Sequence, residues 1–302
     1  MAPSARSCWR RGAVAAACLA AGAAFAQEPR DHAIPSCYEQ LRDFAPRETT
    51  GDLTVIVDQT TFLDARMRQI IHETVDRLVR PGTRISIAVF SAYVDGRYLD
   101  VLASGQTETA IDAKQRDFVP KRELRQNDQC LADQLAFAHR LVAKTLDAAF
   151  AGIDPNIVRS DILAALRDIG RRVAEAPSGN RMVIVVSDML ENSSITSFYQ
   201  GSRLRDVDPK VELKKTLDAG VRADFAGARV VVIGAGIVSD KATDGRSYRD
   251  PRAMLDLEDF WRRWFAASHG DIVEFGKPTP LVEIGWAPPP PAGASASVAA
   301  AH

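Results

Sequence analysis

The sequence has no excess of positive charge and little cysteine or histidine. Lys and Arg total 38 against 39 Asp and Glu, with four cysteines and five histidines in 302 residues. A general nucleic-acid-binding protein would show a strong basic excess, so that class is excluded. The histidines are scattered and show no zinc-binding spacing. After residue 26 no apolar stretch is long enough to cross a bilayer, so the mature chain is expected to have no transmembrane segment.

Residues 1–26 have the pattern of a secretory signal peptide. Arg6, Arg10 and Arg11 precede an alanine-rich apolar stretch, and residues 24–26 form a small-x-small cleavage pattern. Cleavage after residue 26 would remove three arginines and no acid, which leaves 35 basic and 39 acidic residues. Lipidation at Cys18 is the alternative, but the apolar run before it is short. We therefore predict an exported protein, either periplasmic or secreted.

Two of the four cysteines, Cys37 and Cys130, lie outside the predicted signal peptide. An even pair of cysteines in an oxidising compartment predicts a disulfide bond. Closing a loop of this length would stabilise the chain by about 4 kcal/mol in the chain-entropy treatment. Two separate buried thiols are the alternative.

Apolar runs alternate with amphipathic segments, which predicts an α/β fold with helices on both faces of a sheet. Six strands are expected, at 53–57, 84–92, 97–104, 181–186, 228–233 and 271–275. Helices are expected at 61–80, 129–149, 160–174, 213–226 and 251–268, with a polar loop and a short helix within 190–207. Residues 93–96 are too few for a parallel crossover, so the strands around them must be antiparallel. The prediction is a three-layer, doubly wound, mostly parallel six-stranded sheet with one antiparallel edge strand.

The composition divides the chain into four parts. An N-terminal extension, 27–50, precedes an α/β domain at 51–276 that carries an insertion at about 105–154. Residues 277–302 form a tail rich in proline and alanine, which cannot bury enough apolar surface to fold alone and is expected to be flexible. Recognition of its prolines by a partner is the alternative to a bare tail.

Polar residues follow two of the predicted strands. Asp58 comes directly after the first strand and Asp188 directly after the strand at 181–186, while Ser160 opens the helix between them. Parallel strands share a carboxyl edge, and ligands of open α/β sheets bind outside that edge. If these two strands are neighbours, the two carboxylates meet there, and Ser160 could reach the same place.

This arrangement resembles the von Willebrand factor type A domain family over about residues 51–275. The resemblance rests on Asp58-x-Thr60, on Ser160 after an insertion, on Ser187-Asp188 after the 181–186 strand, and on the run VVVIGAG. In that family these loops form a metal-ion-dependent adhesion site with the pattern Asp-x-Ser-x-Ser, a Thr and an Asp. The resemblance implies binding of Mg²⁺ or Mn²⁺, with a partner's Asp or Glu side chain completing the metal coordination.

Carried over by position, the metal ligands would be Asp58, Thr60, Ser160 and Asp188. Phe62 stands where the second Ser is expected, and a phenyl ring cannot serve as a ligand for a metal that requires near-octahedral oxygen coordination. Either water fills this position, or Thr61 turns inward, or the site has lost its metal. The site is therefore predicted to be a degenerate one.

Each of these residues also has a simpler interpretation. Thr60 or Thr61 could cap the first helix, with Asp64 completing a capping box. Ser160 could be the N-cap of its own helix, and Asp188 could accept hydrogen bonds from loop amides. The sequence alone leaves both interpretations open.

The favoured function is a non-catalytic, exported protein-protein interaction module that binds a partner at the carboxyl edge of the sheet. One alternative is a metal-assisted hydrolase at the same edge, in which two acids around a metal activate water. Another is a structural component of a secretion or conjugation assembly in the cell envelope. No histidine lies near Ser160 or Ser187 in the sequence, so nucleophilic catalysis lacks its usual base.

Overall fold

The structure is a computed structural model that describes residues 33–46, 49–94, 97–154, 157, 159–200, 203–237, 251–276 and 284–286. The predicted signal peptide at 1–26 lies outside these residues. Within them, no helix combines the length and the apolar character needed to span a membrane.

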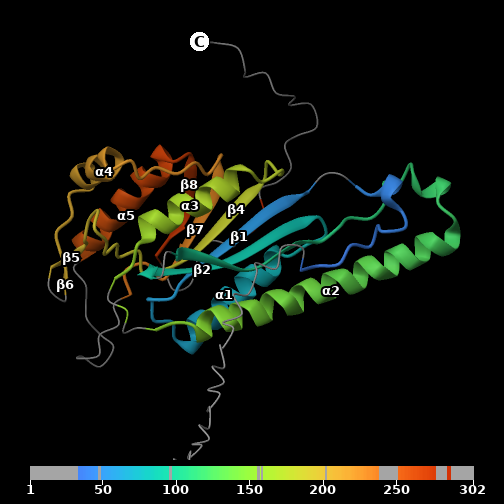
Figure 1. Ribbon diagram of the computed structural model, residues 1–302, viewed down its shortest axis with the longest axis horizontal. Coiled ribbons are helices and arrows are strands. Elements are labelled where there is room, and N and C mark those ends of the chain that lie inside the picture. The colour runs from blue at the N-terminus through green and yellow to red at the C-terminus, as the bar shows by residue number, and fades with distance from the viewer. Residues whose placement is uncertain are drawn as a thin grey trace, which may run out of the picture.

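Six strands form one sheet in the order β3-β2-β1-β4-β7-β8 (Figure 1). Their bounds are β1 Gly51–Asp58, β2 Thr83–Val94, β3 Arg97–Gln106, β4 Arg181–Val186, β7 Ala228–Ile233 and β8 Gly270–Phe275. Every neighbouring pair is parallel except β2 and β3, which pair antiparallel at one edge. The predicted fold class is confirmed, and its topology is that of a von Willebrand factor type A-like domain.

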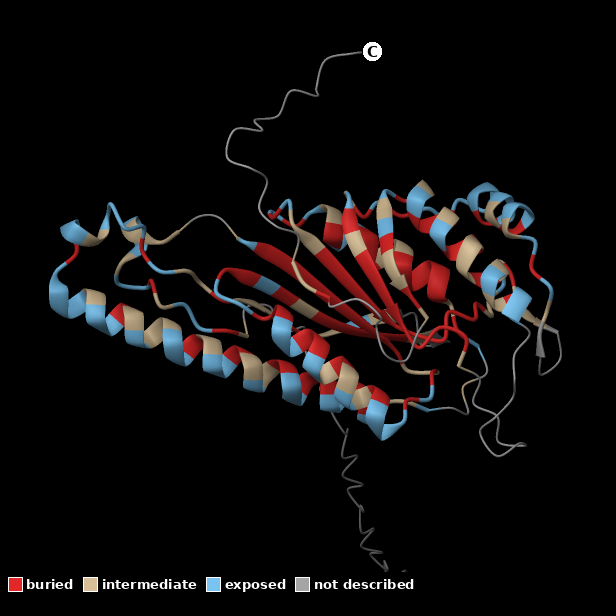
Figure 2. Ribbon diagram, turned by 180° about the vertical axis from the view of Figure 1, so that it is seen from behind, coloured by how far each residue is buried: buried red, intermediate tan, exposed pale blue. Residues whose placement is uncertain are grey.

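Helices cover both faces of this sheet (Figures 1 and 2). They are α1 Ala65–Leu78, α2 Lys121–Ala151, α3 Ile162–Ala174, α4 Pro209–Asp218 and α5 Pro251–Ala267. The side chains of α1 and α2 share one core cluster with the sheet, and those of α3 and α5 share another on the opposite face. α4 contacts α5. β1 and β4 are buried along almost their whole length, as expected of central strands covered on both faces.

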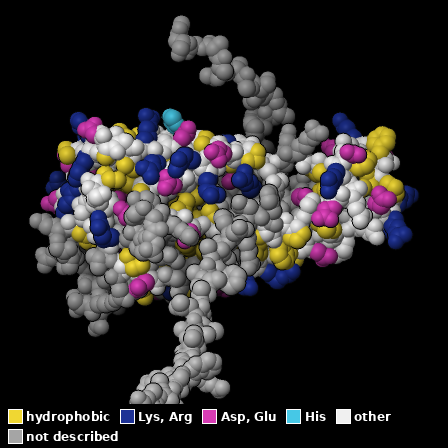
Figure 3. All heavy atoms as spheres, in the orientation of Figure 1, with side chains coloured by type: hydrophobic (Ala, Val, Ile, Leu, Met, Phe, Trp, Pro, Cys, Tyr) yellow, Lys and Arg dark blue, Asp and Glu magenta, His cyan; other side chains and the backbone are white. Residues whose placement is uncertain are grey.

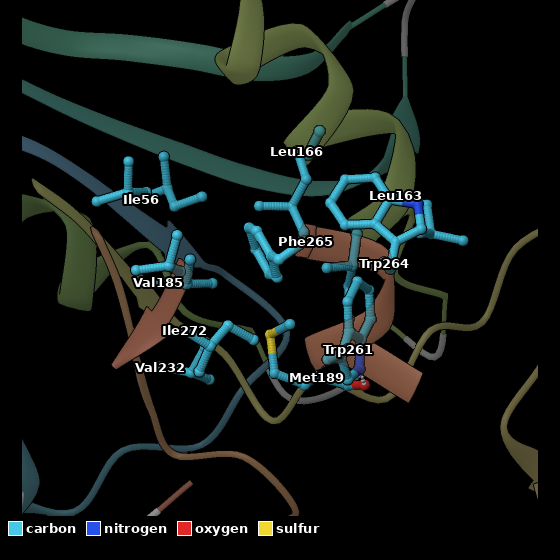
Figure 4. Close-up of a cluster of buried hydrophobic side chains, with 14 of the residues drawn as sticks. Ile56, Leu163, Leu166, Val185, Met189, Val232, Trp261, Trp264, Phe265 and Ile272 are labelled. Atoms are coloured by element: carbon cyan, nitrogen blue, oxygen red, sulfur yellow. Dashed lines mark hydrogen bonds between the residues drawn. The ribbon is translucent and has the colours of Figure 1, made fainter. Parts of the chain in front are cut away.

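Large aromatic side chains of α5 fill the core on the α3 side (Figure 4). Trp261, Trp264 and Phe265 are completely buried, and burial of each side chain contributes roughly 1.5–3 kcal/mol. Both indole N–H groups are satisfied, because Trp261 donates to the carbonyl of Met189 and Trp264 to that of Val221. The first of these bonds ties α5 to the loop that follows β4.

α1 begins later than the expected residue 61. Its N-cap is Asp64, whose carboxylate accepts a hydrogen bond from the amide of Met67 at 2.8 Å. The prediction that Thr60 or Thr61 caps this helix is therefore wrong. The four residues before Asp64 form a loop instead, which leaves both threonine hydroxyls available at the carboxyl edge.

Two other helices differ in extent from the prediction. α2 starts at Lys121 rather than 129, directly after Pro120, whose fixed φ is compatible with a helix start. α4 begins at Pro209 rather than 213 because the Asp208 carboxylate accepts hydrogen bonds from two amides of the first turn. It ends at Asp218, before Gly220, which has a φ of 71°.

The short helix expected within 190–207 is replaced by a hairpin, β5 Tyr199–Gln200 and β6 Arg203–Leu204. Serine hydroxyls in this segment accept hydrogen bonds from backbone amides two residues ahead, at Ser193 and Ser197. Such local side-chain bonds compete with helix formation. The segment therefore turns repeatedly rather than coiling into a helix.

The predicted disulfide is confirmed. Cys37 and Cys130 are bonded, with 5.8 Å between their Cα atoms and a sequence separation of 93. The backbone of Cys37 is also held by side chains, since its amide donates to Glu108 and its carbonyl accepts from Asn127. The disulfide and the bond from Asn127 fasten the N-terminal extension to the first half of α2. The segment predicted as an insertion contains α2, which contacts α1, β2 and β3.

Three described residues of the predicted tail pack against the domain. Ile284 is buried, and the indole of Trp286 donates to the carbonyl of Leu78 at 2.9 Å. The Trp286 ring lies so close to Gly51 that a Cβ there would be 2.8 Å from it. The chain therefore returns to the amino end of β1 after leaving β8.

Candidate functional site

The carboxyl ends of β1 and β4 lie side by side. The two strands pair in parallel up to Val57 and Val186, so Asp58, the last residue of β1, and Ser187, the first residue after β4, lie at the same edge of the sheet. The chain continues from β1 to β2 on one side, and β4 lies on the other side. This is the arrangement in which open α/β sheets bind ligands.

Asp58 is the centre of this edge. One carboxylate oxygen, Oδ1, accepts hydrogen bonds from the amide and the hydroxyl of Thr60 at 2.8 and 2.6 Å. The other, Oδ2, accepts from the hydroxyl of Ser187 at 2.8 Å and from that of Ser160 at 3.2 Å. A carboxylate has about four acceptor positions, so these four donor groups fill them. We call Asp58, Thr60, Ser160 and Ser187 the Asp58 cluster.

The Asp58 carboxyl is 0% exposed. Burial raises its pKa, and the hydrogen bonds from Thr60, Ser187 and Ser160 act in the opposite direction. A buried carboxylate is tolerated only when it is paired or hydrogen-bonded. The four donors therefore provide the stabilisation that water would otherwise give.

Asp188 lies in the next turn of the same loop. Its carboxylate accepts a hydrogen bond from the amide of Leu190 at 2.9 Å, and its own amide donates to the hydroxyl of Thr61 at 2.9 Å. Thr61 is buried and turned inward, as one of the three alternatives for the Phe62 position anticipated. Phe62 itself is 48% exposed.

Glu191 is a residue of this region that the sequence analysis missed. Its side chain is completely buried, and Oε2 accepts a hydrogen bond from the amide of Leu163 in the first turn of α3 at 2.9 Å. Burial raises the pKa of this carboxyl to about 8. The N-cap residue of α3 is Asp161, which makes no side-chain capping bond, so the prediction that Ser160 caps this helix is wrong. The sequence could have indicated Glu191, because it follows the buried strand at 181–186 by only a few residues.

The loop after β4 is held in a strained conformation. Met189 has a φ of 59°, which is uncommon for a residue other than glycine, and its side chain is buried. Its carbonyl accepts from Trp261, and the carbonyl of Asp188 accepts from the amide of Gly236 at 2.7 Å. Strain of this kind persists only where the surroundings determine the conformation, and it concentrates at functional sites.

The predicted metal ligands are together at one edge, but their arrangement does not fit a resident Mg²⁺ or Mn²⁺ ion. Their oxygen atoms are of the type that these ions prefer. However, both oxygens of Asp58 already accept bonds from the chain, and Phe62 points into solvent rather than toward the cluster. Among the described residues, no group of three His, Cys, Asp or Glu side chains could hold a metal.

The hydroxyls of the cluster are also committed. Ser160 and Ser187 both donate to Asp58, whereas an activated nucleophile would donate to a general base such as histidine. The described histidines make other pairs, since His72, His139 and His269 each contact an aspartate outside the cluster. The cluster is thus suited to holding loops in place.

No protein family and no curated protein was found to match the sequence. Among solved structures, the pilus adhesin SpaC from Lactobacillus rhamnosus GG, in its open conformation, is similar with a TM-score of 0.41 and 11% identity. The match covers 78% of this chain, which spans only 29% of the adhesin.

Two other solved structures are similar over most of their own length. An aerotolerance-related membrane protein from Bacteroides fragilis NCTC 9343 has a TM-score of 0.33 and 13% identity, covering 74% of this chain and 90% of that one. The conserved hypothetical protein BatB from Bacteroides thetaiotaomicron has a TM-score of 0.32 and 11% identity, covering 76% and 91%. Likenesses this distant carry no functional argument, and the fold assignment stands on the strand order and register.

Proposed function

We propose that this chain is a non-catalytic protein-protein interaction module, exported to an oxidising compartment, that binds a partner protein at the carboxyl edge of its sheet. The observation that carries the proposal is that three separate loops converge on Asp58 and are fixed there by four hydrogen bonds. A surface of preorganised loops loses little conformational freedom when a partner binds.

The same edge offers a side chain suited to protein recognition. Phe62 is 48% exposed on the loop between β1 and α1, two residues after Thr60. Aromatic residues are enriched among those that dominate the binding energy of protein interfaces. A partner with an apolar pocket beside polar groups would match this edge.

The distribution of charge supports a protein partner over a nucleic acid. On the face shown in Figure 3, basic side chains of the described residues are interspersed with acidic ones. Nucleic-acid binding would require basic side chains gathered on one surface.

Export is part of the proposal. The Cys37–Cys130 disulfide is typical of proteins in an oxidising compartment. The signal peptide predicted at 1–26 would direct the chain there.

The resemblance also implies a metal-dependent form of the proposal. In it a partner's Asp or Glu side chain completes the coordination of Mg²⁺ or Mn²⁺ held by Asp58, Thr60, Ser160 and Asp188. Metal titration tests this form separately from partner binding.

Site-specific photo-crosslinking tests the proposed function. A photoreactive phenylalanine analogue at Phe62 should crosslink one defined partner in the cell envelope of the expressing organism. Phe118, which is 77% exposed near the disulfide, is a matched control for an exposed aromatic side chain. A partner captured from position 118 and not from position 62 would contradict the proposal.

A further inference from the structure

The Asp58 carboxylate performs a task in this chain that leaves no role for a metal ion. Thr60 comes from the loop after β1, Ser160 from the segment before α3, and Ser187 from the loop after β4. Each donates at least one hydrogen bond to Asp58. The carboxylate therefore joins its own loop to two others, whose Ser160 and Ser187 lie 102 and 129 residues from it in sequence.

We propose that the Asp58 cluster is a metal-independent hydrogen-bonded hub, and that the carboxyl edge binds its partner without a divalent cation. The second half of this statement rests on the proposed function. The first half stands on the geometry of the cluster alone.

The space around Asp58 supports the hub. Mg²⁺ demands near-octahedral geometry and usually keeps several of its water ligands. Asp58 and Ser187 are both 0% exposed, and Ser160 is buried as well. An ion with its water shell could reach Asp58 only by displacing hydroxyls that now donate to it.

The residue at the position of the missing ligand and the residue before it support the same conclusion. Thr61, whose hydroxyl could have replaced the absent serine, accepts a hydrogen bond from the amide of Asp188. Phe62 turns its ring to solvent. Both residues therefore have a role that does not require metal, Thr61 in binding the β4 loop and Phe62 at the surface.

Thermal unfolding distinguishes a hub from a metal site. The purified chain is stripped with chelator and titrated with Mg²⁺, Mn²⁺ and Ca²⁺ to millimolar concentration, alongside Asp58→Asn, Asp58→Ala and the control Asp52→Asn. The expected result is no metal-dependent shift in any of them. A metal at a hundredfold over its dissociation constant would raise the midpoint by roughly 5–10 °C. A shift of that size in the wild type, absent from Asp58→Asn and present in Asp52→Asn, would overturn the proposal.

The two substitutions at Asp58 give a second readout. An asparagine can still accept from Thr60 through its carbonyl oxygen, and the serine hydroxyls can rotate to accept from its amide. Asp58→Asn should therefore unfold closer to the wild type than Asp58→Ala does. Equal destabilisation by both would contradict the hub. If Asp58→Ala does not fold, the metal titrations of the wild type and of Asp58→Asn still distinguish a hub from a metal site.

Crosslinking from position 62 separates the two proposals. Capture of the partner should be unchanged by chelator. Capture that is lost with chelator and restored by Mg²⁺ would overturn the metal-independent hub and leave the proposed function standing. No capture under either condition would overturn the proposed function. The unfolding experiment would still test the metal-independent hub by itself.

Discussion

β1 carries a buried aspartate at each end, and the two have very different surroundings. Asp58, at the carboxyl end, is 0% exposed, and Asp52, at the amino end, is 5% exposed. Asp58 accepts four hydrogen bonds from neighbouring loops. Asp52 has Arg84 at 3.7 Å, and its Oδ2 has no hydrogen bond. The same residue type on one strand is a hub at one end and a poorly satisfied charge at the other.

The difference shows that the supply of donors decides what a buried acid does. Burial raises the pKa of Asp52 to about 6, with Arg84 and Arg181 acting in the opposite direction. At the carboxyl end, neighbouring loops bring three hydroxyl donors to Asp58. At the amino end, the Oδ2 atom of Asp52 has no donor. Burial alone therefore does not mark a functional site.

The largest expected effect comes from removing each carboxylate in turn. Asp58→Ala leaves the donors of Thr60, Ser160 and Ser187 without their acceptor, and should lower the free energy of unfolding by about 3–5 kcal/mol. Asp52→Ala removes a carboxylate with few partners and should cost far less. Urea unfolding of both variants at pH 7 measures the difference. Equal losses of unfolding free energy in the two variants would show that the number of donors does not set the contribution of a buried acid.

Glu191 extends the comparison to a third buried acid. Its folded pKa of about 8 lies above the ordinary value of 4.5, so the folded state holds its proton more tightly than the unfolded chain does. The contribution of this carboxyl to stability should therefore be full below about pH 4.5 and be lost as the pH rises through about 8. Glu191→Gln, which carries no charge, should be more stable than wild type by about 4 kcal/mol at pH 8. Unfolding curves from pH 4 to 9 measure the slope, and its part between about pH 6 and 8 should disappear in the variant.

Asp52→Asn should stabilise the protein in a narrower pH range. The pKa of Asp52 is raised from 3.8 to about 6, so its contribution to stability is full below about pH 4 and lost by about pH 6. At pH 7 the neutral asparagine should be more stable by about 2–3 kcal/mol, and at pH 3.5 the two proteins should be equal. A constant difference at both pH values would show that charge is not the cause.

The smallest effects should come from single donors of the cluster. Ser187→Ala removes a 2.8 Å bond to Asp58 and also the hydroxyl that accepts from the amide of Met189. It should cost about 2 kcal/mol, whereas Ser160→Ala, which removes a 3.2 Å bond, should cost about 1 kcal/mol. Double-mutant cycles with Asp58→Asn measure the coupling. A larger loss at Ser160 than at Ser187 would contradict this order.

Much of the fold could be predicted because its signals are local. The strands at 181–186 and 228–233 appear at the predicted residues, since both are continuous apolar runs between turns. The disulfide followed from the count of cysteines. The start of α1 was missed because Thr60, Thr61 and Asp64 are all good capping residues, and only the folded loop selects Asp64.

The sequence by itself determined the strands that Asp58 and Asp188 follow, because apolar runs are properties of the chain, whereas the pairing of those strands as neighbours came from the tertiary structure. Only the tertiary structure decided which atoms meet. It gave Asp58 its four donors, turned Thr61 inward and Phe62 outward, and placed Glu191 at the start of α3. Hydrogen bonds form over about 3 Å and depend on angle, so they are fixed only when distant segments are packed together.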